Sequence, residues 1–284
     1  MNRFESTGAG LEEAWADRVR ANREQSERFR EATSDDFYAP VSAQFVADPR
    51  RTGEPVLDVL AAIAGRAETW LDIGAGAGRY ALPLALRVRE VVAVEPSAGM
   101  RQALRAGMGE HGIGNVRVVA GTWPESLPEL GDLPAVDVAL IAHVGYDIEQ
   151  IGPFLDAMET ASRERCVAVL TDRSPASVAD PLWPLVHGEA RVALPALPEL
   201  LALLRARGRE TELIRVDRTP RTFESPETLA AFLRRQLLIE EGGAADRRFR
   251  EVFPDQVTLR DGGWTLVEPP AGSIGVLTWG VPGR

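Results

Sequence analysis

The chain has 284 residues, of which 45% are hydrophobic and 26% are charged, and this composition predicts a globular protein with a buried core. Its formal net charge of −10 argues against a nucleic-acid substrate, because neutralising phosphate groups requires a basic surface. All 32 basic residues are arginine, which excludes both P-loop lysine chemistry and lysine Schiff bases.

The sequence also indicates where the protein acts. No run of about 18 apolar residues occurs, so no membrane span is expected. Residues 1–20 are polar and acidic and lack the apolar centre of a signal peptide. The single cysteine, Cys166, lies in an apolar run and permits no internal disulfide. We therefore expect a cytoplasmic protein that binds neither a membrane nor nucleic acid, with Cys166 in a buried strand.

The N-terminal part is interpreted as a helical extension over residues 1–54. Residues 11–31 are predicted to form a polar helix with a thin apolar stripe that includes Trp15. Three uses of the stripe are open: it covers an active-site mouth, contacts a second subunit, or rests on the domain. A proline-containing loop follows, and Tyr38 in this loop is a candidate lid residue that lines the substrate site. Residues 55–64 are expected to form the next helix.

Residues 69–97 contain the clearest functional pattern. An apolar run, Trp70–Ile73, is bounded by glycines and predicts a buried parallel strand. Glycines at alternate positions follow, so the backbone can turn sharply and approach a ligand closely. These glycines are Gly74, Gly76 and Gly78. A helix is expected over Tyr80–Val88 with a local kink at Pro83, and a second apolar strand then ends at Glu95.

Two kinds of cofactor fit a glycine turn between a strand and a helix. Dinucleotide-binding domains use such a turn, and a later acid, here Glu95, then bonds a ribose hydroxyl. The spacing here is G-x-G-x-G rather than G-x-G-x-x-G, and the carboxylate of Asp72 just before the turn would repel a pyrophosphate. That carboxylate suits a cationic ligand such as S-adenosylmethionine, which carries a sulfonium, an ammonium and no phosphate.

The stretch Leu71–Arg79, LDIGAGAGR, resembles the first motif of the Rossmann-like (class I) S-adenosylmethionine-dependent methyltransferases. Residues 95–97, Glu-Pro-Ser, and the following Met100 look like the second motif of that family. The resemblance extends from about Trp70 to Leu170. It implies an α/β fold with a doubly wound, mostly parallel seven-stranded sheet. It also implies S-adenosylmethionine as cofactor, with S-adenosylhomocysteine as product.

The resemblance assigns residues to the cofactor. Asp72 and the glycine turn would hold its amino-acid part, and Glu95 would bond both ribose hydroxyls. The adenine would lie after the third strand, 116–119, where Thr122 replaces the usual acid and Trp123 offers a flat apolar face. The expected cofactor-binding residues are Asp72, Gly74, Ala75, Gly76, Gly78, Arg79, Glu95, Pro96, Met100, Gly121, Thr122, Trp123 and His143.

Two candidate catalytic residues, His143 and Tyr146, follow the fourth predicted strand, 135–142. Ligands of α/β sheets bind at this edge, so either side chain could meet an acceptor. His143 would act as a base or position the acceptor, and a structural or cofactor-lining role is equally open for it. A helix over 148–162 and a fifth strand over 166–171 are expected next. No metal site is predicted, because three histidines show no ligand spacing.

The later residues are expected to complete the sheet and to recognise the substrate. Segment 180–189 is predicted to line an acceptor pocket, with His187 as a substrate-lining residue. A helix over 198–207 and a sixth strand over 210–216 follow. We therefore interpret 55–220 as the cofactor-binding domain.

A helical insertion is predicted before the last strand. It covers residues 221–270, with helices over 228–239 and 247–253, and is expected to form one wall of the substrate site. Residues 271–284 would then supply the last strand, whose apolar run covers 274–279.

The sequence therefore predicts in-line transfer of a methyl group from S-adenosylmethionine to a small-molecule acceptor, by a monomer or a homodimer. Two alternatives stay open at this point. One is an NAD(P)-dependent oxidoreductase. The other is a non-catalytic S-adenosylmethionine-binding protein, since no obvious catalytic base stands out.

Overall fold

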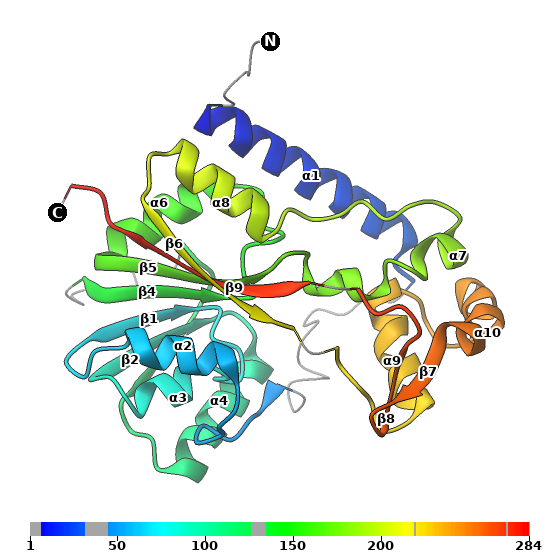
Figure 1. Cartoon of the computed structure of the whole chain (residues 1–284), viewed down its shortest axis with the longest axis horizontal. Coiled ribbons are helices and arrows are strands. Elements are labelled where there is room, and N and C mark those ends of the chain that lie inside the picture. Colours follow the sequence, from blue (N-terminus) through cyan, green and yellow to red (C-terminus); the bar gives the residue numbers. More distant parts are fainter. Residues whose placement is uncertain (1–6, 32–44, 126–134, 219, 271, 284) are drawn as a thin grey trace.

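The computed structural model describes residues 7–31, 45–125, 135–218, 220–270 and 272–283. In these residues the centre of the molecule is a seven-stranded sheet with the strand order β3-β2-β1-β4-β5-β9-β6 (Figure 1). Its first five strands are parallel, whereas β9 is antiparallel to both β5 and β6. The strands are β1 (Thr69–Ile73), β2 (Glu90–Glu95), β3 (Val116–Ala120), β4 (Val136–Ala142), β5 (Ser162–Thr171), β6 (Thr211–Asp217) and β9 (Ser273–Gly280). The predicted doubly wound, mostly parallel sheet is confirmed.

Helices cover both faces of the sheet, and their apolar sides form two buried layers (Figure 1). One layer holds α2, α3 and α4, with Leu60 and Leu104 fully buried, and the other holds α1, α6 and α8, with Val19 and Leu203 buried. These helices are α1 (Gly8–Phe29), α2 (Pro55–Ile63), α3 (Ala81–Ala85), α4 (Ala98–His111), α6 (Ile151–Ala161) and α8 (Leu197–Ala206). Because both faces are covered, β1 is buried at every position, which accounts for its nearly continuous apolar sequence.

The helix expected over Tyr80–Val88 is shorter in the structure, where only α3 is helical. Pro83 lies inside α3 and has no N–H to donate to the preceding turn. The side-chain amide of Asn115 donates to the carbonyl oxygens of Ala85 and Val88 at 2.8 and 3.2 Å. These bonds satisfy carbonyl groups after the helix end, so the chain can leave the helix early.

Strand β5 begins earlier than the apolar pattern predicts. The expected helix included Ser162, whereas α6 ends one residue before it. The Ser162 hydroxyl lies within hydrogen-bond distance of the carbonyl oxygens of Asp137 and Arg165, at 3.0 and 2.7 Å, and these contacts hold a polar segment in the sheet. Cys166 is fully buried in β5, as predicted.

The N-terminal helix α1 rests on the domain, which is the third of the uses considered for its apolar stripe. Trp15 is 3% exposed and donates its indole N–H to the carbonyl oxygen of Ile148 at 2.9 Å. Farther along the helix, Asn22 and Gln25 hydrogen-bond to the backbone of the segment that contains Val192. Trp15 is therefore already covered within the chain. Tyr38 lies outside the described residues.

The insertion folds into a separate apolar cluster, which we call the cap (residues 175–187 and 223–266). Figure 1 shows it beyond the end of β6 and the start of β9. Its elements are η2 (Pro175–Ala179), α7 (Trp183–His187), α9 (Pro226–Leu237), α10 (Ala244–Gln256), β7 (Val257–Arg260) and β8 (Gly263–Leu266). Both predicted helices are present, but the β7–β8 hairpin was not foreseen, because β7 is short and only half apolar. Among the described residues, no helix has the length and apolarity to cross a bilayer.

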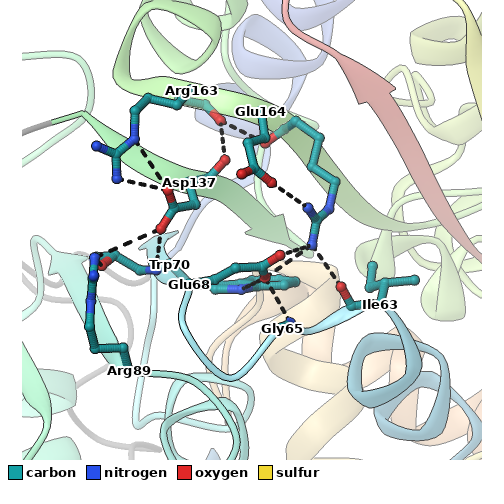
Figure 2. A network of polar contacts seen from close by, with 11 residues as sticks. Ile63, Gly65, Glu68, Trp70, Arg89, Asp137, Arg163 and Glu164 are labelled. Atoms are coloured by element: carbon teal, nitrogen blue, oxygen red, sulfur yellow. Dashed lines mark hydrogen bonds and ion pairs between the residues drawn. The ribbon is translucent and has the colours of Figure 1, made fainter.

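Polar networks fix the strands at the edge where β1, β4 and β5 begin (Figure 2). The Glu68 carboxylate accepts hydrogen bonds from the Trp70 indole at 2.8 Å and from the Gly65 N–H at 2.9 Å. It also accepts two from Arg165, at 2.9 and 3.0 Å, and the same guanidinium donates to the carbonyl oxygen of Ile63. One carboxylate thus joins β1, β5 and the end of α2.

A second carboxylate, that of Asp137 in β4, also joins neighbouring strands. It accepts the backbone N–H of Thr69 at 2.7 Å and is paired with Arg163 at 2.7 Å. Side chains at this edge are therefore satisfied by one another, which is typical of a region that serves stability.

Replacing Glu68 with alanine should lower the free energy of unfolding by about 2–3 kcal/mol, because Arg165 and the Trp70 N–H would lose a partly buried charged partner. Urea unfolding measures this as a lower midpoint at an unchanged slope. Glu164→Ala is the matched control, since Glu164 pairs with the same arginine but its side chain is 55% exposed. The control should change the midpoint little. If the two variants lose the same free energy of unfolding, the hydrogen bonds of Glu68 do not contribute specially to stability.

Candidate cofactor-binding and active site

The predicted site residues converge on the opposite edge of the sheet. Strands β1, β2, β3 and β4 are parallel, so their carboxyl ends lie together. The glycine turn follows β1, Glu95 ends β2, Gly121 follows β3 and His143 follows β4. The sheet thus brings together residues that are up to 70 positions apart in the chain.

Two of the three glycines are required by close packing. A Cβ atom on Gly74 would lie 2.6 Å from the Val144 side chain, and one on Gly78 would lie 2.5 Å from that of Leu104. The turn is held to β2 because the Gly74 N–H donates to the carbonyl oxygen of Val94 at 2.8 Å. These glycines shape the turn and do not indicate a ligand.

Gly76 differs from the other two glycines. A Cβ atom there would meet no atom within 4 Å, so this glycine faces open space. Its φ of +56° is in the left-handed region, and its N–H donates to Oε2 of Glu95 at 2.8 Å. The turn therefore brings bare backbone to an open surface beside an acidic side chain.

Glu95 is held in one orientation. Its other oxygen, Oε1, accepts the N–H of Ser97 at 2.8 Å, and the side chain is 5% exposed. A carboxylate offers about four acceptor positions and can therefore accept several hydrogen bonds at once. The arrangement fits a group that accepts hydrogen bonds from a ligand without moving.

Asp72 is a buried carboxyl group in the middle of the sheet edge. Only 2% of the residue is exposed, and no described residue donates a hydrogen bond to it. Burial, and then the charge of Glu95, raise the pKa of Asp72 to about 7. Two acidic groups therefore share a poorly solvated region, which favours a cation and disfavours phosphate.

His143 occupies a strained position at the end of β4. Its φ is +58°, its N–H donates to the carbonyl oxygen of Val169 at 2.8 Å, and its ring centroid lies 6.2 Å from that of Tyr80. The buried Nδ1 atom has no hydrogen-bond partner among the described residues. Burial, followed by the charges of Arg79 and Arg218, lowers the pKa of His143 to about 4. The imidazole is therefore neutral at pH 7.

Comparison with known proteins decides the class. Residues 71–164 match the family described as methyltransferase domain. A probable cobalt-precorrin-6B C(15)-methyltransferase (decarboxylating) of Methanothermobacter thermautotrophicus is 26% identical over 136 residues, which span 45% of this chain and 69% of that protein. Residues 71–164 form a class I, S-adenosylmethionine-dependent methyltransferase domain.

Solved structures share its fold. A putative methyltransferase from Bacillus halodurans C-125 has a TM-score of 0.55 at 15% identity, over 81% of this chain and 100% of that one. A methyltransferase from Thiobacillus denitrificans in complex with S-adenosylhomocysteine has a TM-score of 0.51 at 15% identity, over 87% and 98%. At these identities the likeness shows the fold alone.

The methyltransferase family answers the question of cofactor that the glycine turn left open. S-adenosylmethionine is the cofactor, and the protein is an enzyme. The NAD(P)-dependent oxidoreductase and the non-catalytic binding protein are therefore both disfavoured. The buried carboxyl group of Asp72 also argues against the oxidoreductase, because it would repel the pyrophosphate of a dinucleotide.

Tyr146 is part of the internal hydrogen bonding of the methyltransferase domain. Its hydroxyl accepts the backbone N–H of Thr171 at 2.8 Å and shares a hydrogen bond with the Thr171 hydroxyl at 2.9 Å. The residue is 4% exposed, and burial raises its pKa to about 12. This geometry favours a structural role, so the catalytic role of Tyr146 stays a prediction without support here.

Trp123 and His187 also serve packing. Trp123 is 7% exposed, belongs to the core and points its indole N–H at the carbonyl oxygen of Phe154 at 3.3 Å. His187 lies in the cap, where its ring is 4.4 Å from that of Trp183 and its Nε2 atom is 2.9 Å from the carbonyl oxygen of Leu237. Their predicted contacts with adenine and with substrate stay predictions.

The other predicted cofactor residues lie on the same edge. Met100 and Ala75 are buried, Gly121 is half-buried beside Glu95, and three residues are exposed. The exposed residues are Arg79, Pro96 and Thr122. Their exposure leaves their backbone and side chains accessible to a ligand.

Sequence reasoning missed two charged residues of this region. Glu54 accepts hydrogen bonds from Arg79 at 2.9 Å and from Arg51 at 2.6 Å, and so fixes the arginine of the glycine turn. Arg218 follows β6, and its charge acts on His143. No local motif marks either residue, because only the folded sheet and α2 bring them near the site. Among the described residues, no group of three His, Cys, Asp or Glu side chains is arranged to hold a metal ion.

Asp72→Asn should stabilise the cofactor-free protein at pH 8 by about 1–3 kcal/mol relative to wild type, and little at pH 4. The pKa of Asp72 is raised from 3.8 to about 7, so folded Asp72 keeps a proton that the unfolded chain releases. Its contribution therefore lowers stability as the pH rises from about 4 to 7, and asparagine removes that contribution.

Thermal unfolding across this pH range measures the difference between variant and wild type. Asp255→Asn, at an exposed position, is the control. If the stability difference between Asp72→Asn and wild type is the same at every pH from 4 to 8, the pKa of Asp72 is not raised in the folded protein.

Proposed function

We propose that this domain transfers the methyl group of S-adenosylmethionine to a small-molecule acceptor by in-line displacement. The observation that carries the proposal is the open space at Gly76, beside which the carboxyl groups of Asp72 and Glu95 are buried. A cofactor with a sulfonium and an ammonium suits a negatively charged, poorly solvated site. The family match independently supports methyl transfer.

Each residue of the edge would hold one part of the cofactor. Asp72 and the glycine turn would bind the amino-acid part, because they combine accessible backbone with a carboxyl group that no described residue hydrogen-bonds. Glu95 would accept hydrogen bonds from the ribose hydroxyls, since the N–H groups of Gly76 and Ser97 hold its carboxylate in a fixed orientation. The backbone around Gly121 would lie beside the adenine.

When bound, the cofactor supplies a methyl group that its sulfonium has already activated, so the protein mainly needs to align the acceptor. His143 is suited to this task, because its ring is neutral and its buried Nδ1 atom has no hydrogen-bond partner in the described part of the chain. A pKa of about 4 makes it a weak base at pH 7, so it would orient an acceptor by a hydrogen bond rather than take a full proton.

A small acceptor is favoured by two observations. The net charge of −10 disfavours nucleic acid. The relative from Methanothermobacter thermautotrophicus is described as acting on a cobalt-precorrin, which is a small molecule, although it is only 26% identical over part of the chain. Action in the cytoplasm, as a monomer or a homodimer, belongs to the same proposal.

Gly76→Ala should weaken binding of S-adenosylhomocysteine at least tenfold while the protein stays folded. A methyl group there would enter the open space that the ligand needs. The matched control is Gly112→Ala, since Gly112 has a similar φ of +64° and also faces open space, but lies at the end of α4.

Both substitutions introduce the same backbone strain, of about 1–2 kcal/mol, and should lower the unfolding temperature by similar amounts. Calorimetry then separates strain from ligand contact. Undiminished affinity in Gly76→Ala, or an equal loss in Gly112→Ala, would mean that the cofactor does not lie against this turn.

A further inference from the structure

A cavity opens at the edge of the sheet where β5 ends. It has a volume of about 380 Å³ and is lined by α1, by the residues that follow β5, by η2 and by the start of α8. Thr171, which bonds to Tyr146, immediately precedes the lining residues Asp172 and Arg173. The cavity therefore lies at the end of the strand beside β4, which His143 follows. Ligands of open α/β sheets bind outside these strand ends.

Two buried polar atoms in the cavity lack a hydrogen-bond partner among the described residues. The Ser177 hydroxyl and Oδ1 of Asp180 both line it, and neither atom has a hydrogen-bond partner among the described residues. Ser177 is only 5% exposed, and buried polar groups in native proteins are normally satisfied. Asp180 is ion-paired with Arg191 but accepts no hydrogen bond from a described residue, and the Ser177 hydroxyl has no partner there, so both atoms can bond to a ligand.

The charge around Asp180 selects the kind of partner. The Arg191 guanidinium lies 3.7 Å from Oδ1 of Asp180, and it is fixed by a 2.7 Å bond to the carbonyl oxygen of Ala176 and by stacking over Trp183. A ligand ammonium at Asp180 would lie close to this cation and be repelled. A neutral hydroxyl donates a hydrogen bond without that repulsion.

A different side chain at the cavity is suited to an acidic group. Arg173 is exposed, its guanidinium forms no hydrogen bond or ion pair with any described residue, and its charge, like that of Arg191, acts on Asp180. The other charged side chains are occupied, because Arg18 pairs with Glu199 and Asp172 pairs with Arg215. Arg173 is therefore the cation available to a carboxylate, which it can bind with two parallel hydrogen bonds.

We propose that this cavity binds the methyl acceptor, and that the acceptor is a small hydroxy acid. Its hydroxyl donates to Asp180 beside Ser177, and its carboxylate is bound by Arg173. The apolar walls, which include Val192, Leu194 and Pro198, accommodate a hydrocarbon or aromatic body. This inference rests on the proposed function, because it takes the adjacent cofactor region as the source of the methyl group.

The test uses the full chain saturated with S-adenosylhomocysteine and 3-hydroxybenzoate as the probe. Calorimetry should detect binding of 3-hydroxybenzoate and at least tenfold weaker binding of benzoate, which lacks the hydroxyl, and of 3-hydroxybenzamide, which lacks the charge. Nuclear Overhauser effects between the probe and S-adenosylhomocysteine should appear in the ternary complex. Equal affinity for the three probes, or absence of these effects, overturns the proposal.

Two serine variants separate binding from folding. Ser177→Ala should weaken 3-hydroxybenzoate binding about tenfold without lowering the unfolding temperature, because the Ser177 hydroxyl bonds to none of the described residues. Ser162→Ala is the matched control, since Ser162 is equally buried but contacts Asp137 and Arg165. It should lower the unfolding temperature and leave probe affinity unchanged.

The remaining outcomes are also decisive. Asp180→Asn and Arg173→Gln should each lower the affinity for 3-hydroxybenzoate at least fivefold. Both variants should bind S-adenosylhomocysteine as tightly as the wild-type protein does. If Ser177→Ala, Asp180→Asn and Arg173→Gln all bind 3-hydroxybenzoate as tightly as wild type, the assignment of the cavity is wrong. The proposed function is not contradicted by that result. Failure of the wild-type protein to bind S-adenosylhomocysteine contradicts the proposed function, and the acceptor assignment with it.

Discussion

Two neighbouring buried carboxyl groups, Asp72 and Glu95, are the constraint on which the cofactor edge depends. The backbone N–H groups of Gly76 and Ser97 donate hydrogen bonds to the Glu95 carboxylate. No described residue donates a hydrogen bond to Asp72, and its pKa is raised by burial and by Glu95. An acid that is strained in the free protein is stabilised by a bound cation. The same carboxyl group thus lowers stability and contributes affinity, a trade-off common at functional sites.

The two edges of the sheet differ in how their polar groups are satisfied. Where the parallel strands begin, Glu68 and Asp137 are bonded on several sides by neighbouring arginines and backbone (Figure 2). Where they end, Asp72, Nδ1 of His143 and the Ser177 hydroxyl lack hydrogen-bond partners among the described residues. Unsatisfied groups are costly inside a protein, so their concentration at one edge favours a ligand-binding role for that edge.

The sequence predicts local features well and distant neighbours poorly. The glycine turn and the acid that ends β2 follow from apolar runs and from motif spacing, which are local, whereas the seven-stranded sheet was implied by the resemblance to a known family. The packing of Trp123 against α6 and the contact of Trp15 with Ile148 depend on which helix covers which strand. A buried tryptophan and a ligand-stacking tryptophan look alike in the sequence. Segment 180–189 was expected to line an acceptor pocket; Asp180 at its start lines the cavity, whereas His187 packs in the cap.

The most direct test of this account is the number of protons released when S-adenosylmethionine binds. Calorimetry in buffers of different ionisation enthalpy measures that number. Because the pKa of Asp72 is about 7 in the free protein, binding of a cation should release nearly one proton at pH 6 and about half a proton at pH 7. Binding heats that are independent of the buffer at both pH values would contradict the account, because Asp72 would then be ionised before the cofactor arrives.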